Sequence, residues 1–388
     1  MATLMELIER PLADEPFVLL DVGASGGIAP TWNTFRPHLR AFGFEPLLSE
    51  CSRLNQASDP GIEFVPAFVT GSPLPPPEPF PWPQWWDNRF WYRTSTVAAL
   101  QLLKTQMDDI FNRGDAIELS KDEFTIDTFV QARALDPDFL KIDTDGTDFE
   151  VLRGAEKTLP RLLGVMIEAE FHGSGRPDAN TFSNMDSYLR AAGFSLADLQ
   201  IYRYSRAALP RRFIHDFPSG TEHGQVKWAD AIYLRDAAFP DYCDLWNWRP
   251  SAAKLVKLLA LCELFGLQDC AVELLLAFRD SFEKFLDVPA ALDALTPDDL
   301  GGERLSYPDY MAAFTGNPAR FYARGPGPSS ADLRQQIASL TEERDAAKIA
   351  LSSLQASLSW RLAAPLRGLG QLKRKLSGAS PPSTGAST

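Results

Sequence analysis

FVLLDVGASGG, residues Phe17 to Gly27, joins a run of apolar residues to a turn rich in glycine. A continuous apolar run such as Phe17 to Leu20 is typical of a parallel strand that is covered on both faces. The glycines after it permit a sharp turn and let backbone N–H groups approach a ligand at the start of the next helix. By itself, this turn is equally compatible with a ligand site and with a plain connection.

Further apolar runs follow up to about residue 234, and segments with helical patterns separate them. These runs are RAFGFEP (40–46), IEFVPAF (62–68), DFLKIDTDG (138–146), GVMIEAEF (164–171), LADLQIYRY (196–204) and ADAIYL (229–234). Strands that alternate with helices predict a doubly wound α/β domain, which we place at residues 1–240. Ligands bind at the carboxyl ends of the strands in such sheets, and Gly23, Gly146 and Gly173 follow strand ends there.

Other parts of the chain do not show this alternation of strands and helices. Residues 71–93 hold seven prolines and four tryptophans, which excludes a helix or a central strand. A helical subdomain is predicted for residues 241–328, and Leu255 to Phe278 is interpreted as a buried helical pair because charged residues interrupt it. Leucines at alternating three- and four-residue steps predict a coiled coil that leads into a basic amphipathic segment, together 331–376. Residues 377–388 are expected to be a disordered tail.

Composition excludes several classes of protein. The net charge of −13 argues against a nucleic-acid partner, because phosphate binding requires clustered Lys and Arg residues. The four cysteines form no C-x-x-C pair, and the first residues lack the order of a secretory signal. No stretch reaches the roughly 18 apolar residues of a membrane span. These features predict a cytoplasmic protein with reduced thiols.

A carboxylate supports a nucleotide-type site at the first turn. Glu45 ends the second predicted strand, 24 residues after Asp21, where such folds place an acid that accepts hydrogen bonds from a ribose diol. The dinucleotide pattern G-x-G-x-x-G would need a second glycine where Ser25 stands. The turn therefore fits an adenosine cofactor without a pyrophosphate better.

The densest group of acidic residues follows the strand at 139–142. Asp148 and Glu150 fall in the first turn of the next predicted helix, where carboxylates have a capping role. Asp143 differs, because it stands at the carboxyl end of a central strand, where substrates lie, and its acidic neighbours favour its protonated form.

These motifs together carry a resemblance. LLDVGASGG, FGFEP, TIDTF, FLKIDTDGTDFEVLRGAEKTL and MIEAEFH, in this order, resemble the FkbM family of S-adenosylmethionine-dependent methyltransferases over about residues 17–234. The resemblance implies a class I methyltransferase fold, which is Rossmann-like with a seven-stranded, mostly parallel sheet, and O-methylation of a hydroxyl on a sugar or natural product.

The resemblance also implies roles for single residues. The cofactor loop would contain Asp21, Gly23, Ser25 and Gly27, the ribose carboxylate would be Glu45, and Asp143 would lie near the methyl-transfer site. Two positions depart from the family pattern: Ser25 stands where Asn is common, and Asp148 where Glu is common. Both changes keep the polarity of the position.

The C-terminal SLSWRLAAPLR resembles a short element that follows coiled coils in bacterial surface-polysaccharide enzymes. With the FkbM motifs, it suggests a glycan-pathway enzyme held at the inner membrane or in a complex. A basic segment with a tryptophan favours an anionic membrane surface or an acidic partner, and a solvated helix end is the alternative. The heptads also allow an oligomer.

Several side chains are candidates for the chemistry. A general base is needed to accept the proton of the hydroxyl, and the candidates near the strand ends are Asp143, Glu168, Glu170 and His172. Substrate contact is predicted for the tryptophans of the 71–93 insert, whose flat faces suit sugar rings: Trp85, Trp86 and Trp91. No spacing of these residues demands a metal.

Two other functions stay open from the sequence. A nicotinamide-dependent sugar enzyme would also use the glycine turn and Glu45, although the chain has no Y-x-x-x-K pair for it. A non-catalytic scaffold of a polysaccharide-biosynthesis complex would bind a partner enzyme through the coiled coil.

Overall fold

The computed structural model describes residues 3–71, 93–96, 99, 118–214, 220–298, 302, 304–321, 344 and 348. The tryptophans predicted to contact substrate, the heptads of the coiled coil and the tail lie outside the described residues. Residues 1–299 with 303–312 form one compact unit, and residues 300–302 with 313–388 form a second. The strands β1 to β9 all belong to the first unit.

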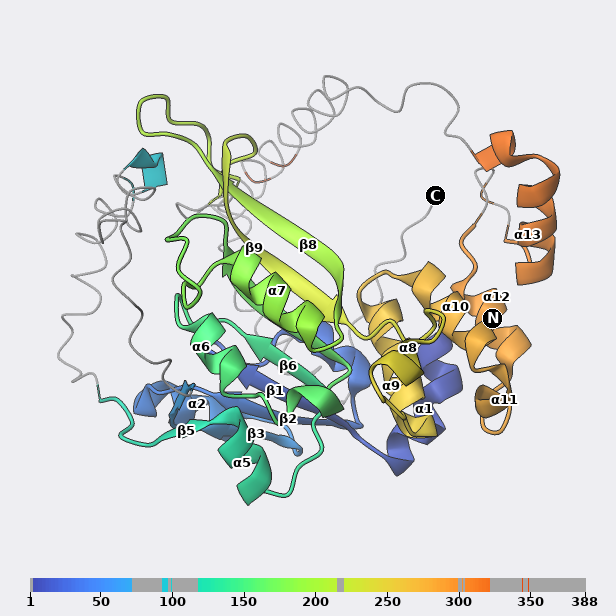
Figure 1. The fold of residues 1–388 in the computed structure, drawn as a ribbon, viewed down its shortest axis with the longest axis horizontal. Helices are drawn as coiled ribbons and strands as arrows, with labels where there is room; N and C mark the ends of the chain where they lie inside the picture. Colours follow the sequence, from blue (N-terminus) through green and yellow to red (C-terminus); the bar gives the residue numbers. More distant parts are fainter. Residues whose placement is uncertain are drawn as a thin grey trace, which may run out of the picture. The chain divides into compact units, whose positions relative to one another are not determined.

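Seven strands form one sheet in the order β3-β2-β1-β6-β7-β9-β8 (Figure 1). Their bounds are β1 Phe17–Val22, β2 Leu39–Phe44, β3 Ile62–Val65, β6 Phe139–Ile142, β7 Gly164–Glu170, β8 Ser195–Tyr204 and β9 Gln225–Leu234. Strand β9 runs antiparallel to both of its neighbours, and the other neighbouring pairs are parallel. The predicted class I methyltransferase fold is therefore confirmed.

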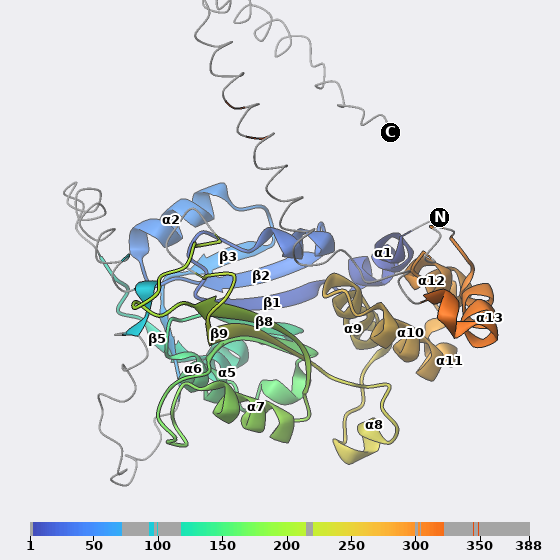
Figure 2. The same ribbon diagram turned by 90° about the horizontal axis from the view of Figure 1, so that it is seen from above.

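Helices cover both faces of this sheet, which explains why its strands are apolar on both sides. The helices along the α/β part are α1 Leu4–Asp14, α2 Leu48–Ala57, α5 Ile126–Ala132, α6 Asp148–Arg153 and α7 Phe182–Ala191, with 3₁₀ helices η1 Pro30–Phe35 and η3 Leu159–Arg161. Figure 2 shows α2 and α5 to α7 on opposite sides of the sheet. Leu20, Phe42 and Leu140 pack with α5 to α7 in one core.

A second hydrophobic core lies on the other face. There Phe17, Leu19 and Phe139 pack with α1, η1 and the helices that follow the sheet. Those helices are α8 Tyr242–Leu245, α9 Ala252–Leu264, α10 Gln268–Ala277, α11 Arg279–Phe282 and α12 Val288–Leu295, followed by α13 Tyr307–Gly316 and η4 Pro318–Phe321. The buried helical pair predicted from Leu255 to Phe278 is confirmed as α9 and α10. The predicted domain boundary at residue 240 separates the sheet and α1 from α8 to α12, although the segments on both sides of it pack together in this second core.

The apolar run predicted as one strand over 62–68 is divided in the structure. Strand β3 ends at Val65, and β4 (Phe68–Thr70) pairs with β5 (Glu123–Thr125) in a separate two-stranded sheet. Pro66 follows β3 directly and has no N–H group with which to continue the ladder.

Two predictions from the sequence concern membrane-spanning helices and the state of the cysteines. None of the helices described is long and apolar enough to cross a membrane. All four cysteines, Cys51, Cys243, Cys262 and Cys270, are free thiols.

Candidate active site

Charged side chains from four strands converge on one face of the sheet, at the carboxyl ends of its parallel strands. Asp21 of β1 is paired in register with Lys141 of β6. One step further along, Glu168 of β7 is paired with Asp230 of β9, and the backbone N–H of Asp143 donates to Val22 at 3.0 Å. Residues that are far apart in the sequence therefore form one polar row.

The glycine turn, residues 23–27, passes very close to the backbone of Asp143 at the end of β6. Gly23 has a φ of +80°, and a Cβ built on it would lie 1.7 Å from the carbonyl oxygen of Asp143. The N–H groups of Gly23 and Ala24 both donate to the carbonyl of Phe44, at 3.2 and 3.1 Å. Gly27 also has a positive φ of +100°. A glycine is thus required where the loop crosses the end of β6.

Asp21 and Lys141 form an ion pair beneath the turn. Asp21 is only 2% exposed, and Lys141 Nζ lies 3.1 Å from its Oδ1. That oxygen receives no well-aligned hydrogen bond from the described residues. Burial raises the pKa of Asp21 to about 6, and the charge of Lys141 opposes this effect. Lys141 also lies 3.4 Å from Asp143 Oδ2 and donates to the carbonyl of Gly23 at 3.3 Å.

Glu45 follows β2 directly, beside the same turn. Its side chain is 7% exposed, and its Oε1 accepts a hydrogen bond from the N–H of Leu47 at 2.7 Å. Ser25 lies in the turn and is exposed. A buried carboxylate beside a turn of glycines at the carboxyl edge of the sheet is the arrangement that binds the ribose diol of an adenosine cofactor, so the residues present fit that group.

Among the four predicted bases, Asp143 and Glu168 lie together. The side chain of Asp143 is 47% exposed, whereas Glu168 is half-buried. Burial, followed by the charge of Asp143 and a hydrogen bond with it, raises the pKa of Glu168 to about 9. Glu168 is therefore the member of the pair whose protonated form is favoured.

Glu170 and His172 have other partners. Lys227, whose side chain is 1% exposed, donates to Glu170 Oε1 at 2.6 Å. His172 Nε2 lies 2.7 Å from the carbonyl oxygen of Val226, which can only accept, so Nε2 carries the proton. Neither group is directed at Asp143 by these contacts.

Asp148 organises the loop after β6 rather than capping the helix that it begins. It is fully buried, and its carboxylate accepts hydrogen bonds from the N–H groups of Thr144 (2.7 Å) and Gly146 (3.0 Å). The side-chain amide of Asn180 adds a further bond at 3.1 Å. These contacts fix the backbone that carries Asp143.

The sequence-based prediction missed three groups of this site: Lys141, Asp230 and Tyr202. Lys141 interrupts an otherwise apolar strand, and that interruption is a usable signal for a paired charge. Tyr202 and Asp230 lie within β8 and β9, where alternation alone does not show which strand end they reach.

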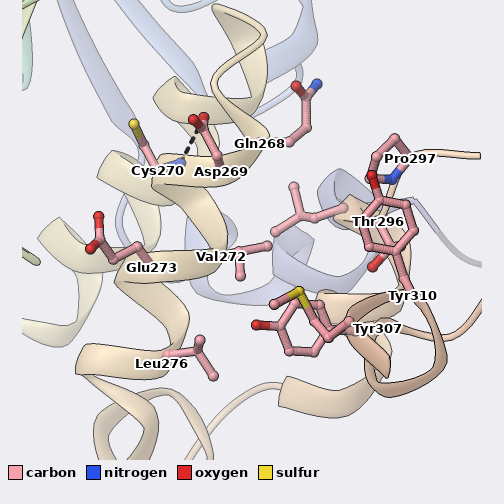
Figure 3. A pocket seen from close by; sticks show the side chains of 12 residues that line it. Gln268, Asp269, Cys270, Val272, Glu273, Leu276, Thr296, Pro297, Tyr307 and Tyr310 are labelled. Atoms are coloured by element: carbon pink, nitrogen blue, oxygen red, sulfur yellow. Dashed lines mark hydrogen bonds between the residues drawn. The ribbon is translucent and has the colours of Figure 1, made fainter. Parts of the chain in front are cut away.

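A separate cavity of about 640 Å³ lies among α10, the end of α12 and α13 (Figure 3). Its lining includes Val272, Leu276 and Tyr307, and Figure 3 shows Asp269 and Glu273 on the α10 side. It has no residue in common with the polar row or the glycine turn. The candidate site for group transfer is therefore the edge of the sheet, and not this cavity.

A family model identifies part of the chain. Residues 83–196 match the methyltransferase FkbM domain. The match includes β5, β6 and β7 with Asp143 and Glu168, whereas Asp21 and Glu45 lie before it. No curated protein matches the chain.

Solved structures give remote similarities. A precorrin-6y C5,15-methyltransferase from Geobacter metallireducens has 12% identity, a TM-score of 0.25 and coverage of 60% of this chain and 87% of that chain. A TehB-like SAM-dependent methyltransferase from Corynebacterium glutamicum has 13% identity, a TM-score of 0.24 and coverage of 60% and 86%. The N-terminal domain of EvdMO1 with SAH bound has 9% identity, a TM-score of 0.27 and coverage of 61% and 81%. Because these TM-scores are low, the fold assignment depends on strand order and register.

Proposed function

We propose that this chain, part of which matches the methyltransferase FkbM domain, is an S-adenosylmethionine-dependent enzyme that methylates a hydroxyl group of a surface glycan or of a glycan precursor. The observation that carries this proposal is the pair formed by Asp143 and Glu168 beside the glycine turn. A hydroxyl acceptor must lose its proton, and a carboxylate at the carboxyl edge of the sheet can accept it.

The residues around the turn are proposed to hold the cofactor. Glu45 would accept hydrogen bonds from a ribose diol, and the turn that contains Gly23, Ser25 and Gly27 would lie against the cofactor. Asp21 and Asp143 would face the charged end. When bound, S-adenosylmethionine supplies a methyl group on a positively charged sulfur.

Asp143 is proposed to accept the proton of the hydroxyl. It is the more exposed member of the pair, and the raised pKa belongs to Glu168. Lys141, 3.4 Å from Asp143, fixes the orientation of this carboxylate. Holding the acceptor and the carboxylate in one geometry is the larger contribution to the rate, because it replaces an encounter between separate molecules.

Further parts of the proposal rest on the sequence. Trp85, Trp86 and Trp91 are proposed to contact the sugar rings of the acceptor. Residues 331–376 are proposed to attach the protein to the inner membrane surface or to a glycan-enzyme complex on the cytoplasmic side, or to form a coiled-coil oligomer.

The test has two stages. Calorimetry compares S-adenosylmethionine with NAD, and we expect binding of the first alone. Transfer of labelled methyl from S-adenosylmethionine is then measured on a panel of cell-surface glycan precursors. Absence of transfer to every hydroxyl acceptor, or transfer to nitrogen or carbon instead, would contradict the proposed function.

Asp143→Asn tests the role of the carboxylate. Loss of a positioned base is expected to lower the transfer rate by about a hundredfold or more. Asp198→Asn is the matched control, because Asp198 is exposed and, among the described residues, its carboxylate accepts a hydrogen bond from the N–H of the neighbouring Leu199. Unchanged transfer in Asp143→Asn would remove Asp143 from the mechanism.

A further inference from the structure

Strand β9 brings a third carboxyl group to the pair formed by Asp143 and Glu168. Asp230 stands directly opposite Glu168 in the antiparallel register of β7 and β9, and Gln200 of β8 stands opposite Asp230. Side chains paired in this way share one face, with Cβ atoms roughly 5 Å apart. Asp230 therefore lies on the side of the pair that faces away from β1 and its glycine turn.

Neighbouring side chains hold the carboxylate of Asp230 in place. The hydroxyl of Tyr202 donates to Asp230 Oδ2 at 3.2 Å, and Gln200 Nε2 donates to the Tyr202 oxygen at 2.8 Å. The ring of Tyr202 stacks on Trp228, with centroids 3.7 Å apart and planes 15° apart. A stacked ring has little rotational freedom, so the orientation of Asp230 is set by β8.

Several carboxyl groups lie near Asp230. Asp143 and Asp145 raise the pKa of Glu168, and Asp143 also raises the pKa of Asp230. Lys141 is the cation that influences Asp230, and it is already paired with Asp21 and Asp143. Burial, opposed by the hydrogen bond from Tyr202, raises the pKa of Asp230 to about 6, which leaves it ionised at neutral pH.

We propose that Asp230, held by Tyr202, is a positioning residue that restricts the acceptor to neutral or amino-bearing polyhydroxy compounds. Carboxylates accept hydrogen bonds only, so they bind hydroxyl and ammonium donors. A uronate or a phosphate ester would place a like charge beside Asp143 and Asp230, which is strongly unfavourable in a desolvated site. This inference rests on the proposed function and names the substrate class of the same site.

Asp230→Asn separates this role from a structural one. The panel contains a neutral glycan, its amino-sugar analogue and its uronate analogue, and KM and kcat are determined for each. Wild-type protein is expected to favour the first two, and Asp230→Asn to reduce the preference over the uronate by about tenfold or more, through the KM of the uronate. Tyr202→Phe is expected to act in the same direction, and Asp198→Asn to have no effect. A wild-type preference for the uronate, or an unchanged ratio in Asp230→Asn, would overturn the proposal.

A second measurement needs no acceptor. Carboxyl ¹³C NMR follows the titration of Asp230, whose midpoint is expected near pH 6. Asp143→Asn should lower this midpoint because a like charge is lost, and Tyr202→Phe should raise it because a donor to the ionised form is lost. A midpoint that neither variant moves would overturn the positioning role. If the midpoints move as expected but no methyl transfer is found, then the proposed function fails while the geometry of Asp230 stands.

Discussion

Asp21→Asn is expected to stabilise the folded protein while it weakens cofactor binding. Asp21 is 2% exposed, and its pKa in the folded state is about 6, compared with 3.8 for a free carboxyl group. Desolvation is the main cause, and it outweighs the ion pair with Lys141 at 3.1 Å. Asparagine has nearly the same shape and carries no charge that must be desolvated. Lys141 keeps Asp143 as a partner in the variant.

The magnitude follows from the difference between the two pKa values. A shift from 3.8 to about 6 corresponds to roughly 3 kcal/mol of free energy of unfolding, at about 1.4 kcal/mol per pH unit. Above pH 6, the ionised Asp21 lowers the free energy of unfolding, because the folded state binds the proton more tightly than the unfolded chain does. This contribution therefore costs nothing below about pH 4, and the cost is fully present above about pH 6. It is an upper value, because the unfolded chain is not free of structure.

Urea denaturation at pH 4.5 and pH 7.5 measures the effect. The wild-type free energy of unfolding should fall between these values, and Asp21→Asn should show a smaller fall and a higher midpoint at pH 7.5. Calorimetry on the same samples should show weaker S-adenosylmethionine binding. An unchanged pH slope, or a lower midpoint for the variant at pH 7.5, would refute the assignment of a desolvation cost to Asp21.

Two other substitutions, each with a matched control variant, probe the turn and the core. Gly23→Ala is expected to abolish cofactor binding in calorimetry, since its Cβ would meet the backbone of β6, whereas Gly26→Ala, with a similar φ of +81° and nothing within 4 Å, should cost only about 1–2 kcal/mol of stability. Equal effects of both would contradict the close approach of Gly23 to the backbone of Asp143. Asp138→Asn should lower the free energy of unfolding in urea by about 3–5 kcal/mol, because this fully buried carboxylate pairs with two buried lysines of α9 at 2.7 and 3.0 Å. Asp136→Asn, at a side chain that is 56% exposed, should cost less than about 1 kcal/mol, and a similar loss in both would show that burial is not the cause.

The sequence predicted those parts of the site that depend on local structure. The turn after β1 needed glycines, and Gly23 and Gly27 have the positive φ values that only such residues adopt easily. The strands β1, β2, β6 and β7 were recognisable because burial on both faces leaves a continuous apolar run. The break at Pro66 was missed, although a proline in a central strand argues against continuing it.

Choosing among the candidate bases required distances that spacing does not provide. Glu168 and Glu170 lie on one face of β7, so the two-residue period of a strand does not distinguish one from the other. The structure separates them by their partners, since Glu168 is hydrogen-bonded with Asp143 whereas Glu170 is ion-paired with Lys227. Which cation reaches which carboxylate depends on the register of β7 with β9, and register is set by the whole sheet.

The second core and the candidate active site lie on the same face of β1 and β6. A single residue on that face can therefore affect both the stability of the fold and the binding of a ligand. Along β1, Phe17 and Leu19 pack in the second core, and Asp21 is the next residue on that face. Along β6, Phe139 belongs to that core and Lys141 follows. Each strand thus changes from apolar to charged residues toward its carboxyl end. The first charged residues, Asp21 and Lys141, are poorly exposed to solvent because they directly adjoin the core. A carboxylate at this position is desolvated before any ligand binds, so the substitution that removes its charge should raise stability and lower binding together.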